Sequence, residues 1–195
     1  MTRSIFIGSV CTFLLLALSG PVAAQGRPPD PAALLAAQRE SMLPLQSMNG
    51  VWRGTASMVH PGGEKQVITQ TERIGPFLDG AVKVIEGRGY DAAGKLAFNS
   101  FGIVSFNPAT RSYSMRSYAR GLVGDFVFRP IPDGYAWEIP AGPATIRYTV
   151  TIKGSTLHEI GERIVAGSEP VRFFEMTLQR VGDTDWPAGG AVGAR

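Results

Sequence analysis

Between residues 50 and 180 the chain consists of short segments rich in Val, Ile, Thr, Phe and Tyr, each separated from the next by turn-forming residues. Such segments are typical of β-strands. We expect ten of them, at 51–59, 66–74, 81–90, 97–106, 112–119, 125–130, 135–139, 144–153, 157–165 and 171–180. Because tight turns join them, successive strands should pair antiparallel, and closure into a barrel would remove the exposed sheet edges.

Composition and residue alternation support the same architecture. Glycine and proline account for 24 and 14 of the 195 residues, which favours a β protein with many turns over a helical bundle. In the segment 146–153, apolar residues alternate with polar ones, as expected for a sheet with one buried face. The sequence therefore predicts an all-β fold, a single antiparallel up-and-down β-barrel of about ten strands preceded by a short helix.

The first residues have the three-part pattern of a secretory signal peptide. Arg3 supplies a positive charge, an apolar run extends from Ile5 to Leu18, and Val22-Ala23-Ala24 is a small-residue cleavage site. At about 14 residues, the run is shorter than the roughly 20 that cross a bilayer. Cleavage after Ala24 would give a periplasmic or secreted bacterial protein without cysteine and without a membrane span, and an uncleaved anchor is the alternative.

The remaining chain divides into three further parts. Residues 25–47 form a leader and a short amphipathic helix, in which Asp30 is a suitable N-cap and Pro31 suits the first helical position. Leu34, Leu35 and Met42 could form its apolar stripe, lying across one end of the domain or binding a partner. Residues 48–181 form the barrel, and 182–195 form a mobile tail without periodicity.

One set of residues carries a resemblance to a known superfamily. The first strand opens with Gly50-Val51-Trp52, the turn Phe77-Leu78-Asp79-Gly80 follows, and the last strand leads to Arg180. These features resemble the secreted bacterial lipocalin-like domains of unknown function in the calycin superfamily. In that superfamily the tryptophan lies under the closed end of the barrel, and an arginine of the last strand packs on it. The resemblance implies that Gly50, Trp52 and Arg180 close the barrel.

The residue types needed for catalysis or metal binding are scarce. The chain has two histidines, His60 and His158, one cysteine and no Gly-x-Ser-x-Gly motif. Glu159 and Glu162 are three residues apart, so on a strand they would face opposite sides. The closing strand contains no histidine, which argues against the haem ligation of the similar nitrobindin barrels. We therefore predict no catalytic residue, no metal site and no cofactor, and the scattered net charge of +3 predicts no nucleic-acid partner.

The barrel interior is the most plausible place for a ligand. If Trp52 and Arg180 face inward, alternation along the last strand places Arg172, Phe174 and Met176 on the concave face. Cross-strand pairing would add Tyr148 and Glu162. The predicted ligand-binding residues are therefore Tyr148, Glu162, Arg172, Phe174 and Met176. Alternatively, Glu162 and Arg172 form an internal ion pair, or a register difference of one residue turns both outward.

These observations favour an exported, non-catalytic protein that binds a small apolar or amphipathic molecule. One alternative is a structural or interaction module of the bacterial envelope, with the barrel filled by its own side chains. A further alternative is an enzyme acting on a lipid-like substrate. The size of the internal cavity distinguishes a ligand-binding barrel from a filled one. Neither the identity of the ligand nor the oligomeric state follows from the sequence.

Overall fold

The computed structural model describes residues 30–184 and residue 186. The predicted signal peptide, residues 1–24, lies outside this range, as does most of the predicted tail. Within the described residues, no helix has the length and apolar character needed to cross a membrane.

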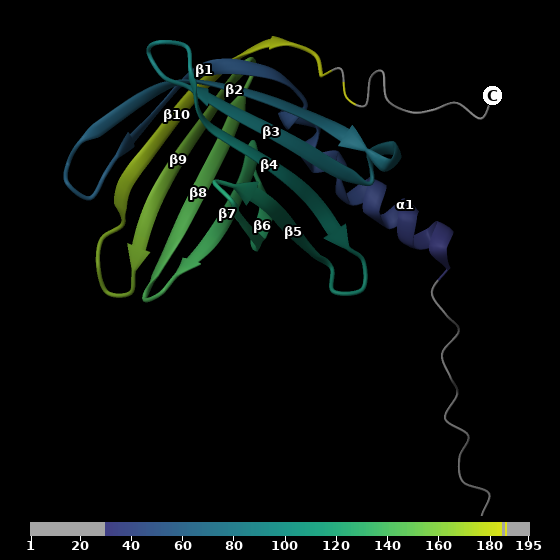
Figure 1. Cartoon of the computed structure of the whole chain (residues 1–195). Helices are drawn as coiled ribbons and strands as arrows, with labels where there is room; N and C mark the ends of the chain where they lie inside the picture. The colour runs from purple at the N-terminus through teal and green to yellow at the C-terminus, as the bar shows by residue number, and fades with distance from the viewer. Residues whose placement is uncertain (1–29, 185, 187–195) are drawn as a thin grey trace, which may run out of the picture.

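The described residues form a short helix, two 3-10 helices and ten strands (Figure 1). The helical segments are α1 (Pro31–Ser41), η1 (Leu43–Met48) and, between two strands, η2 (Leu78–Gly80). The strands are β1 (Gly50–Val59), β2 (Lys65–Phe77), β3 (Val82–Tyr90), β4 (Leu96–Asn107), β5 (Ser112–Ala119), β6 (Leu122–Ile131), β7 (Gly134–Ala141), β8 (Ala144–Lys153), β9 (Thr156–Val165) and β10 (Val171–Gly182).

The ten strands form one closed antiparallel barrel. Each strand pairs with the next one in sequence, and β1 pairs with β10 to complete the ring. Since no strand has a free edge, every strand finds backbone partners on both sides. The predicted all-β fold, with an up-and-down barrel of ten strands and a short helix before it, is confirmed.

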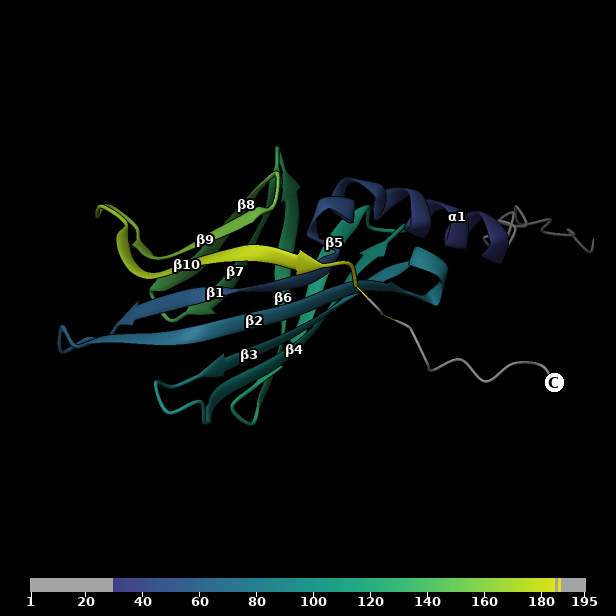
Figure 2. The same cartoon turned by 90° about the horizontal axis from the view of Figure 1, so that it is seen from above.

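The helical segments α1 and η1 lie at one end of the barrel, where η2 also lies (Figure 2). The Asp30 side chain accepts a hydrogen bond from the backbone N–H of Ala32 and so caps α1. The guanidinium of Arg39 on α1 lies 3.0 Å from the Asp79 carboxylate on η2. Leu34 and Leu35 are exposed, whereas Met42, the third residue of the predicted stripe, is buried, so the stripe as a whole does not cover the barrel end.

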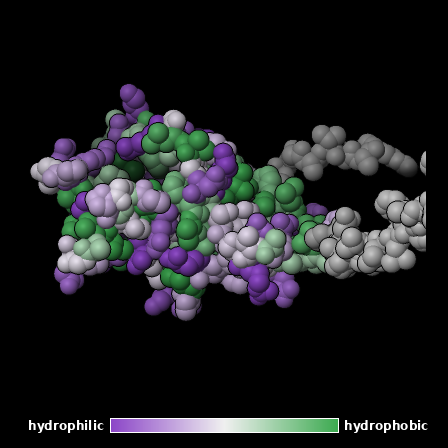
Figure 3. Space-filling model, turned by 90° about the horizontal axis from the view of Figure 1, so that it is seen from below, coloured by the Kyte–Doolittle hydropathy of each residue, from purple (hydrophilic) through white to green (hydrophobic). Residues whose placement is uncertain are grey.

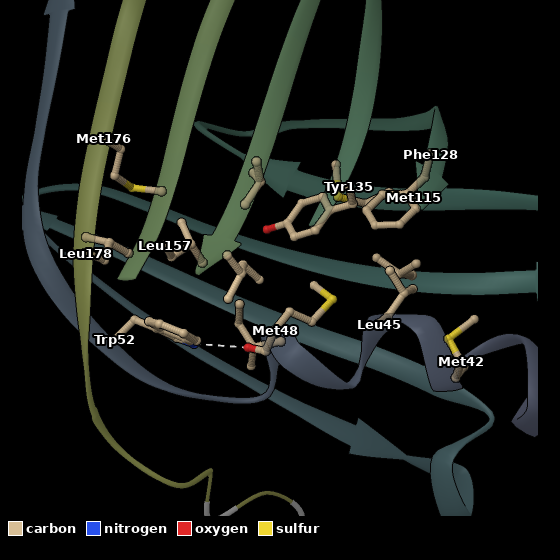
Figure 4. Close-up of a cluster of buried hydrophobic side chains, with 14 of the residues drawn as sticks. Met42, Leu45, Met48, Trp52, Met115, Phe128, Tyr135, Leu157, Met176 and Leu178 are labelled. Carbon is tan, nitrogen blue, oxygen red and sulfur yellow. Dashed lines mark hydrogen bonds between the residues drawn. The ribbon is translucent and has the colours of Figure 1, made fainter. Parts of the chain in front are cut away.

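The barrel end is instead covered by η1 and the residue before it. Met42, Leu45 and Met48 are buried against the side chains of the strands, in the main hydrophobic cluster (Figure 4). This cluster also contains Trp52 and Leu178, whose side chains are fully buried. The 3-10 segment therefore plugs this end of the barrel, which we call the closed end.

Trp52 connects this plug to the first and last strands. Its indole N–H donates a hydrogen bond to the backbone carbonyl of Met48, with 3.0 Å between the two atoms (Figure 4). On β10, the guanidinium carbon of Arg180 lies 5.6 Å from the Trp52 ring centroid, within cation–π range. A side chain at Gly50 would press on that guanidinium, and the φ of +146° at Gly50 also favours glycine.

Trp186 follows the last strand and packs on the outer face of the barrel. Its ring lies 4.2 Å from the guanidinium carbon of Arg73 and 5.7 Å from the Phe77 ring centroid. Gly75 makes room for this approach, because a Cβ there would lie 2.9 Å from the Cβ of Trp186. The mobility predicted for residues 182–195 stays a prediction.

Candidate functional site

The end of the barrel opposite the plug is hollow. A cavity of about 610 Å³ lies inside it and is lined by side chains from all ten strands. This volume is in the range of pockets that bind small organic molecules. Small residues on β4 to β6 line part of this space, namely Ser100, Gly102, Ser117 and Gly124.

Aromatic rings form one wall of the cavity. The rings of Trp137 and Tyr148 are stacked, with 4.4 Å between their centroids and an interplanar angle of 10°. Phe126 lies beside Trp137, and Phe174 meets the Tyr148 ring edge-on at 5.7 Å. Gly161, opposite Phe174 in the β9–β10 register, permits this contact, since a Cβ there would come within 3 Å of both rings' side chains.

Apolar side chains continue this wall to the mouth of the cavity. Leu122 and Val123, in the strand that starts at the mouth, are exposed and also line the cavity. Arg120 lies beside them, with its guanidinium carbon 5.6 Å from the Phe98 ring centroid. On the face of the molecule seen in Figure 3, hydrophobic and hydrophilic residues are interspersed. An apolar ligand that enters the cavity would meet the exposed side chains of Leu122 and Val123.

Two carboxyl groups project into this largely apolar cavity, from β2 and β9. Glu72 accepts a hydrogen bond from the side-chain amide of Gln70. The Glu159 Oε1 accepts one from the indole N–H of Trp137, at 3.2 Å. Glu159 and Gln70 are both buried, whereas Glu72 retains some exposure to the cavity.

Burial makes both carboxyls unusually weak acids. Burial and the charge of nearby Glu159 raise the pKa of Glu72 from 4.5 to about 8. The hydrogen bond from Gln70 acts in the opposite direction. Burial also raises the pKa of Glu159 to about 7, although its hydrogen bond with Trp137 acts in the opposite direction. The two groups influence each other, so they titrate as a pair. At neutral pH the pair holds at least part of its protons.

Two tyrosines accompany the carboxyls. Burial, and then the charges of Glu72 and Glu159, raise the pKa of Tyr135 well above its usual value. Burial also raises the pKa of Tyr148 to about 12. Both phenols are therefore neutral at physiological pH and can donate or accept hydrogen bonds.

Three of the five predicted ligand-binding residues line the cavity: Tyr148, Phe174 and Met176. Glu162 and Arg172 do not, and their placement on the concave face is wrong. The β9–β10 register shifts between Arg172 and Phe174, so Phe173 is an additional residue in a β-bulge. The alternation therefore breaks at the bulge, and the Arg172 side chain is 53% exposed on the outer face, near Glu175.

The same shift explains the position of Glu162. In the strand register, Glu162 lies opposite Arg172 on β10 and opposite Arg147 on β8. The Arg147 guanidinium lies 2.9 Å from the outward-facing Glu138 carboxylate, so Glu162 is on the outer face with them. The predicted opposite orientation of Glu159 and Glu162 is correct, but Glu159 is the inward one. His158 faces outward and lies 2.9 Å from the Glu175 carboxylate.

Sequence reasoning missed Gln70, Glu72 and Glu159. A signal was present on β2, where Ile68, Gln70, Glu72 and Ile74 alternate with polar or charged residues of the outer face. Because polar residues occupy both faces of that strand, the alternation does not say which face is buried. Among the described residues, no group of three or more His, Cys, Asp or Glu side chains could hold a metal ion.

Comparison with known proteins adds no family to this description. A scan against protein-family models finds no matching family, and a search of curated proteins finds no matching relative. The ten-stranded antiparallel barrel is consistent with the calycin-like fold that Gly50, Trp52 and Arg180 suggested.

Proposed function

We propose that this protein is exported and binds a small apolar or amphipathic molecule inside its barrel, without transforming it. The observation that carries the proposal is the 610 Å³ cavity, whose walls are aromatic and aliphatic side chains with few polar groups. This composition is usual for small-molecule sites. A barrel that served only as a structural module would be expected to fill this space with its own side chains.

Binding can be tested with the neutral fluorophore N-phenyl-1-naphthylamine, whose emission rises in apolar surroundings. The mature protein should bind it at one site per barrel. Gly102→Leu should weaken binding at least about tenfold, because Gly102 lines the cavity and a Cβ there has no neighbour closer than 3.6 Å. Gly182→Leu, at an exposed position with open space around it, is the matched control and should bind normally.

The outcome against binding is equally concrete. Absence of a saturable signal in the wild-type protein would overturn the proposal. Equal binding by the wild-type protein and Gly102→Leu would show that the probe binds elsewhere on the surface.

Export requires a separate experiment. The N-terminal sequence supports it, through Arg3, the apolar run and the site ending at Ala24. Expression of the full chain in a bacterium should yield a periplasmic protein that begins at Gln25, as measured by intact mass. Recovery of the full-length chain from washed membranes would contradict cleavage.

A further inference from the structure

The two carboxyl groups of the cavity lie on strands that are close neighbours in the barrel. Glu72 lies opposite Trp52 in the β1–β2 register, and Glu159 lies opposite Met176 in the β9–β10 register. Around the wall, only β1 and β10 separate the two glutamate-bearing strands. The Tyr135 ring, 5.0 Å from the Phe128 ring, stacks on the buried core beside them. A ligand that reached the bottom of the cavity would meet these groups together.

Tyr135 has an unused hydrogen-bonding group at this position. The residue is only 5% exposed, and its hydroxyl points away from Phe128 into the barrel interior (Figure 4). It lines the cavity, and among the described residues the hydroxyl has no hydrogen-bond partner. The hydroxyl opens onto the cavity, so a molecule inside it can form hydrogen bonds with this group. The unused hydroxyl therefore marks a place where a ligand's polar group fits.

The space that these groups occupy is created by two glycines on β3. A Cβ at Gly87 would lie 3.2 Å from the Gln70 amide nitrogen and 3.6 Å from Glu72 Oε1. A Cβ at Gly89 would lie 3.0 Å from the Gln70 amide oxygen. Side chains at these two positions would crowd the Gln70 amide, which donates to Glu72, whereas their contact with Glu72 itself would be an ordinary one. The close approach of the polar pair to the wall depends on this Gly-Arg-Gly segment.

Among the described residues that line the cavity, no cationic side chain lies beside the carboxyl pair. Arg120 is the cation that lines the described cavity, and it stands at the mouth, next to Phe98. Lys83 also faces inward, but it does not line the cavity, and its ammonium donates to the Asn49 side chain at 2.8 Å. Two carboxylates in an apolar cavity need compensation by protons or by another cation.

We propose that Glu72 and Glu159 bind the protonated amine head of an amphipathic ligand, whose apolar body lies along the Trp137–Tyr148–Phe174 wall. This inference rests on the proposed ligand-binding function and adds the chemical class of the ligand. The ammonium donates hydrogen bonds to carboxylate oxygens, and the Tyr135 hydroxyl accepts a further one. Charge-assisted bonds of this kind are the strong ones in a water-poor site.

Binding then exchanges a proton for the ammonium. Without ligand, the pair retains protons near neutral pH, because its pKa values are raised to about 8 and about 7. When the ammonium binds, a carboxyl O–H bond breaks and the proton leaves to solvent, with no covalent change in the ligand. Tyr135 and Tyr148 stay neutral in this range, because burial raises the pKa of both phenols. Affinity for an amine should therefore rise between pH 5.5 and pH 8.

The test compares three compounds with the same ten-carbon chain: decylamine, decanol and decanoate. Each is used to displace N-phenyl-1-naphthylamine from the full mature protein. At pH 8 decylamine should compete at least about tenfold more strongly than decanol, and decanoate should be the weakest. At pH 5.5 the advantage of the amine over the alcohol should shrink to within about threefold, since the carboxyls are then protonated.

Variants connect this preference to the two carboxyls. In Glu72→Gln/Glu159→Gln, decylamine should lose its advantage while N-phenyl-1-naphthylamine still binds. Glu175→Gln is the matched control, because Glu175 lies on the outer face of β10 beside His158 and should leave the preference intact. Titration calorimetry of the wild-type protein at pH 7 in phosphate and in Tris should detect protons released on binding decylamine and none on binding decanol.

The outcomes separate the two proposals. Equal competition by decylamine and decanol, a preference that persists in the double variant, or the absence of proton release overturns the amine site and leaves the binding function intact. Failure of the wild-type protein to bind N-phenyl-1-naphthylamine overturns both. If the double variant does not fold, Glu72→Gln and Glu159→Gln are tested singly, and the calorimetry of the wild-type protein decides.

Discussion

Individual glycines let side chains approach one another closely inside this barrel. Gly87 and Gly89 stand next to Gln70 and Glu72, and Gly161 permits the contact between Tyr148 and Phe174. In the sequence, glycines within strands indicate bulges or close approach but do not identify the neighbour. The neighbour depends on cross-strand register, which brings residues far apart in sequence together.

The buried carboxyls should make stability depend on pH. Their folded-state pKa values, about 8 for Glu72 and about 7 for Glu159, lie above the ordinary 4.5. The folded protein therefore binds these protons more tightly than the unfolded chain. The stability that the two carboxyls contribute is fully present below about pH 4.5. It is lost as pH rises through their folded-state pKa values. The free energy of unfolding should fall by on the order of 5 kcal/mol between pH 5 and pH 7.5, about 3 from Glu72 and about 2 from Glu159.

Urea denaturation at several pH values measures this effect. The chosen range ends below the pKa of Lys83, which burial lowers to about 8 and which gives the opposite slope at higher pH. Glu72→Gln/Glu159→Gln should flatten the profile, whereas Glu175→Gln should not. An unchanged pH dependence in the double variant would mean that other groups control it.

Trp52 and Arg180 should be energetically coupled at the closed end. Trp52 is fully buried, so Trp52→Ala should destabilise the fold by about 3–5 kcal/mol. Arg180→Ala should cost less, because its guanidinium also contacts the exposed Asp183 carboxylate at the surface. A double-mutant cycle by urea denaturation should give a coupling of about 0.5–2 kcal/mol. Strictly additive losses would show that the cation–π contact contributes nothing.

At the scale of elements, the β-bulge in β10 and the plug η1 were the features hardest to predict. The ten strands follow from local residue patterns, and each predicted range overlaps an observed strand. A bulge is one additional residue, and Val171-Arg172-Phe173-Phe174 contains no glycine or proline that would mark it. Counting alternate residues back from Arg180 therefore identifies the inward side chains of β10 correctly as far as Phe174. At Arg172, beyond the bulge, it gives the wrong face.

The plug provides a matched pair of leucines in one short helix. Leu45 is 1% exposed in the core, whereas Leu43, two residues earlier, is 56% exposed. Leu45→Ala should lower the free energy of unfolding by about 2–5 kcal/mol, as buried leucine truncations do. Leu43→Ala should change it by less than about 0.5 kcal/mol, which is typical of surface positions. Similar losses in thermal or urea unfolding would contradict the role of η1 as the plug.

At the scale of the whole molecule, the fold was predictable and the function of its interior was only partly so. Alternation and turns specify a closed antiparallel sheet, because an open one would expose its edges. The cavity, however, depends on the summed volumes of inward side chains from ten strands, and thus on knowing every register. Tyr148, Phe174 and Met176 could be placed from one correct anchor, whereas Glu72 and Glu159 needed registers that the sequence does not reveal.

A hollow barrel should be less stable than the same barrel filled, because side chains lining a void lack packing partners on one side. Gly102 lines the cavity on β4, and a Cβ there would make ordinary contacts with Met115 and Ile85. Gly102→Leu should therefore raise the free energy of unfolding by about 1 kcal/mol, through added apolar burial and a stiffer strand. Urea denaturation measures this gain, and Gly182→Leu at the surface is the control. A loss of stability in Gly102→Leu, with Gly182→Leu unchanged, would mean that the interior has no room for four additional carbon atoms. Gained stability together with weakened probe binding would show that the empty space is kept for a ligand at the expense of packing.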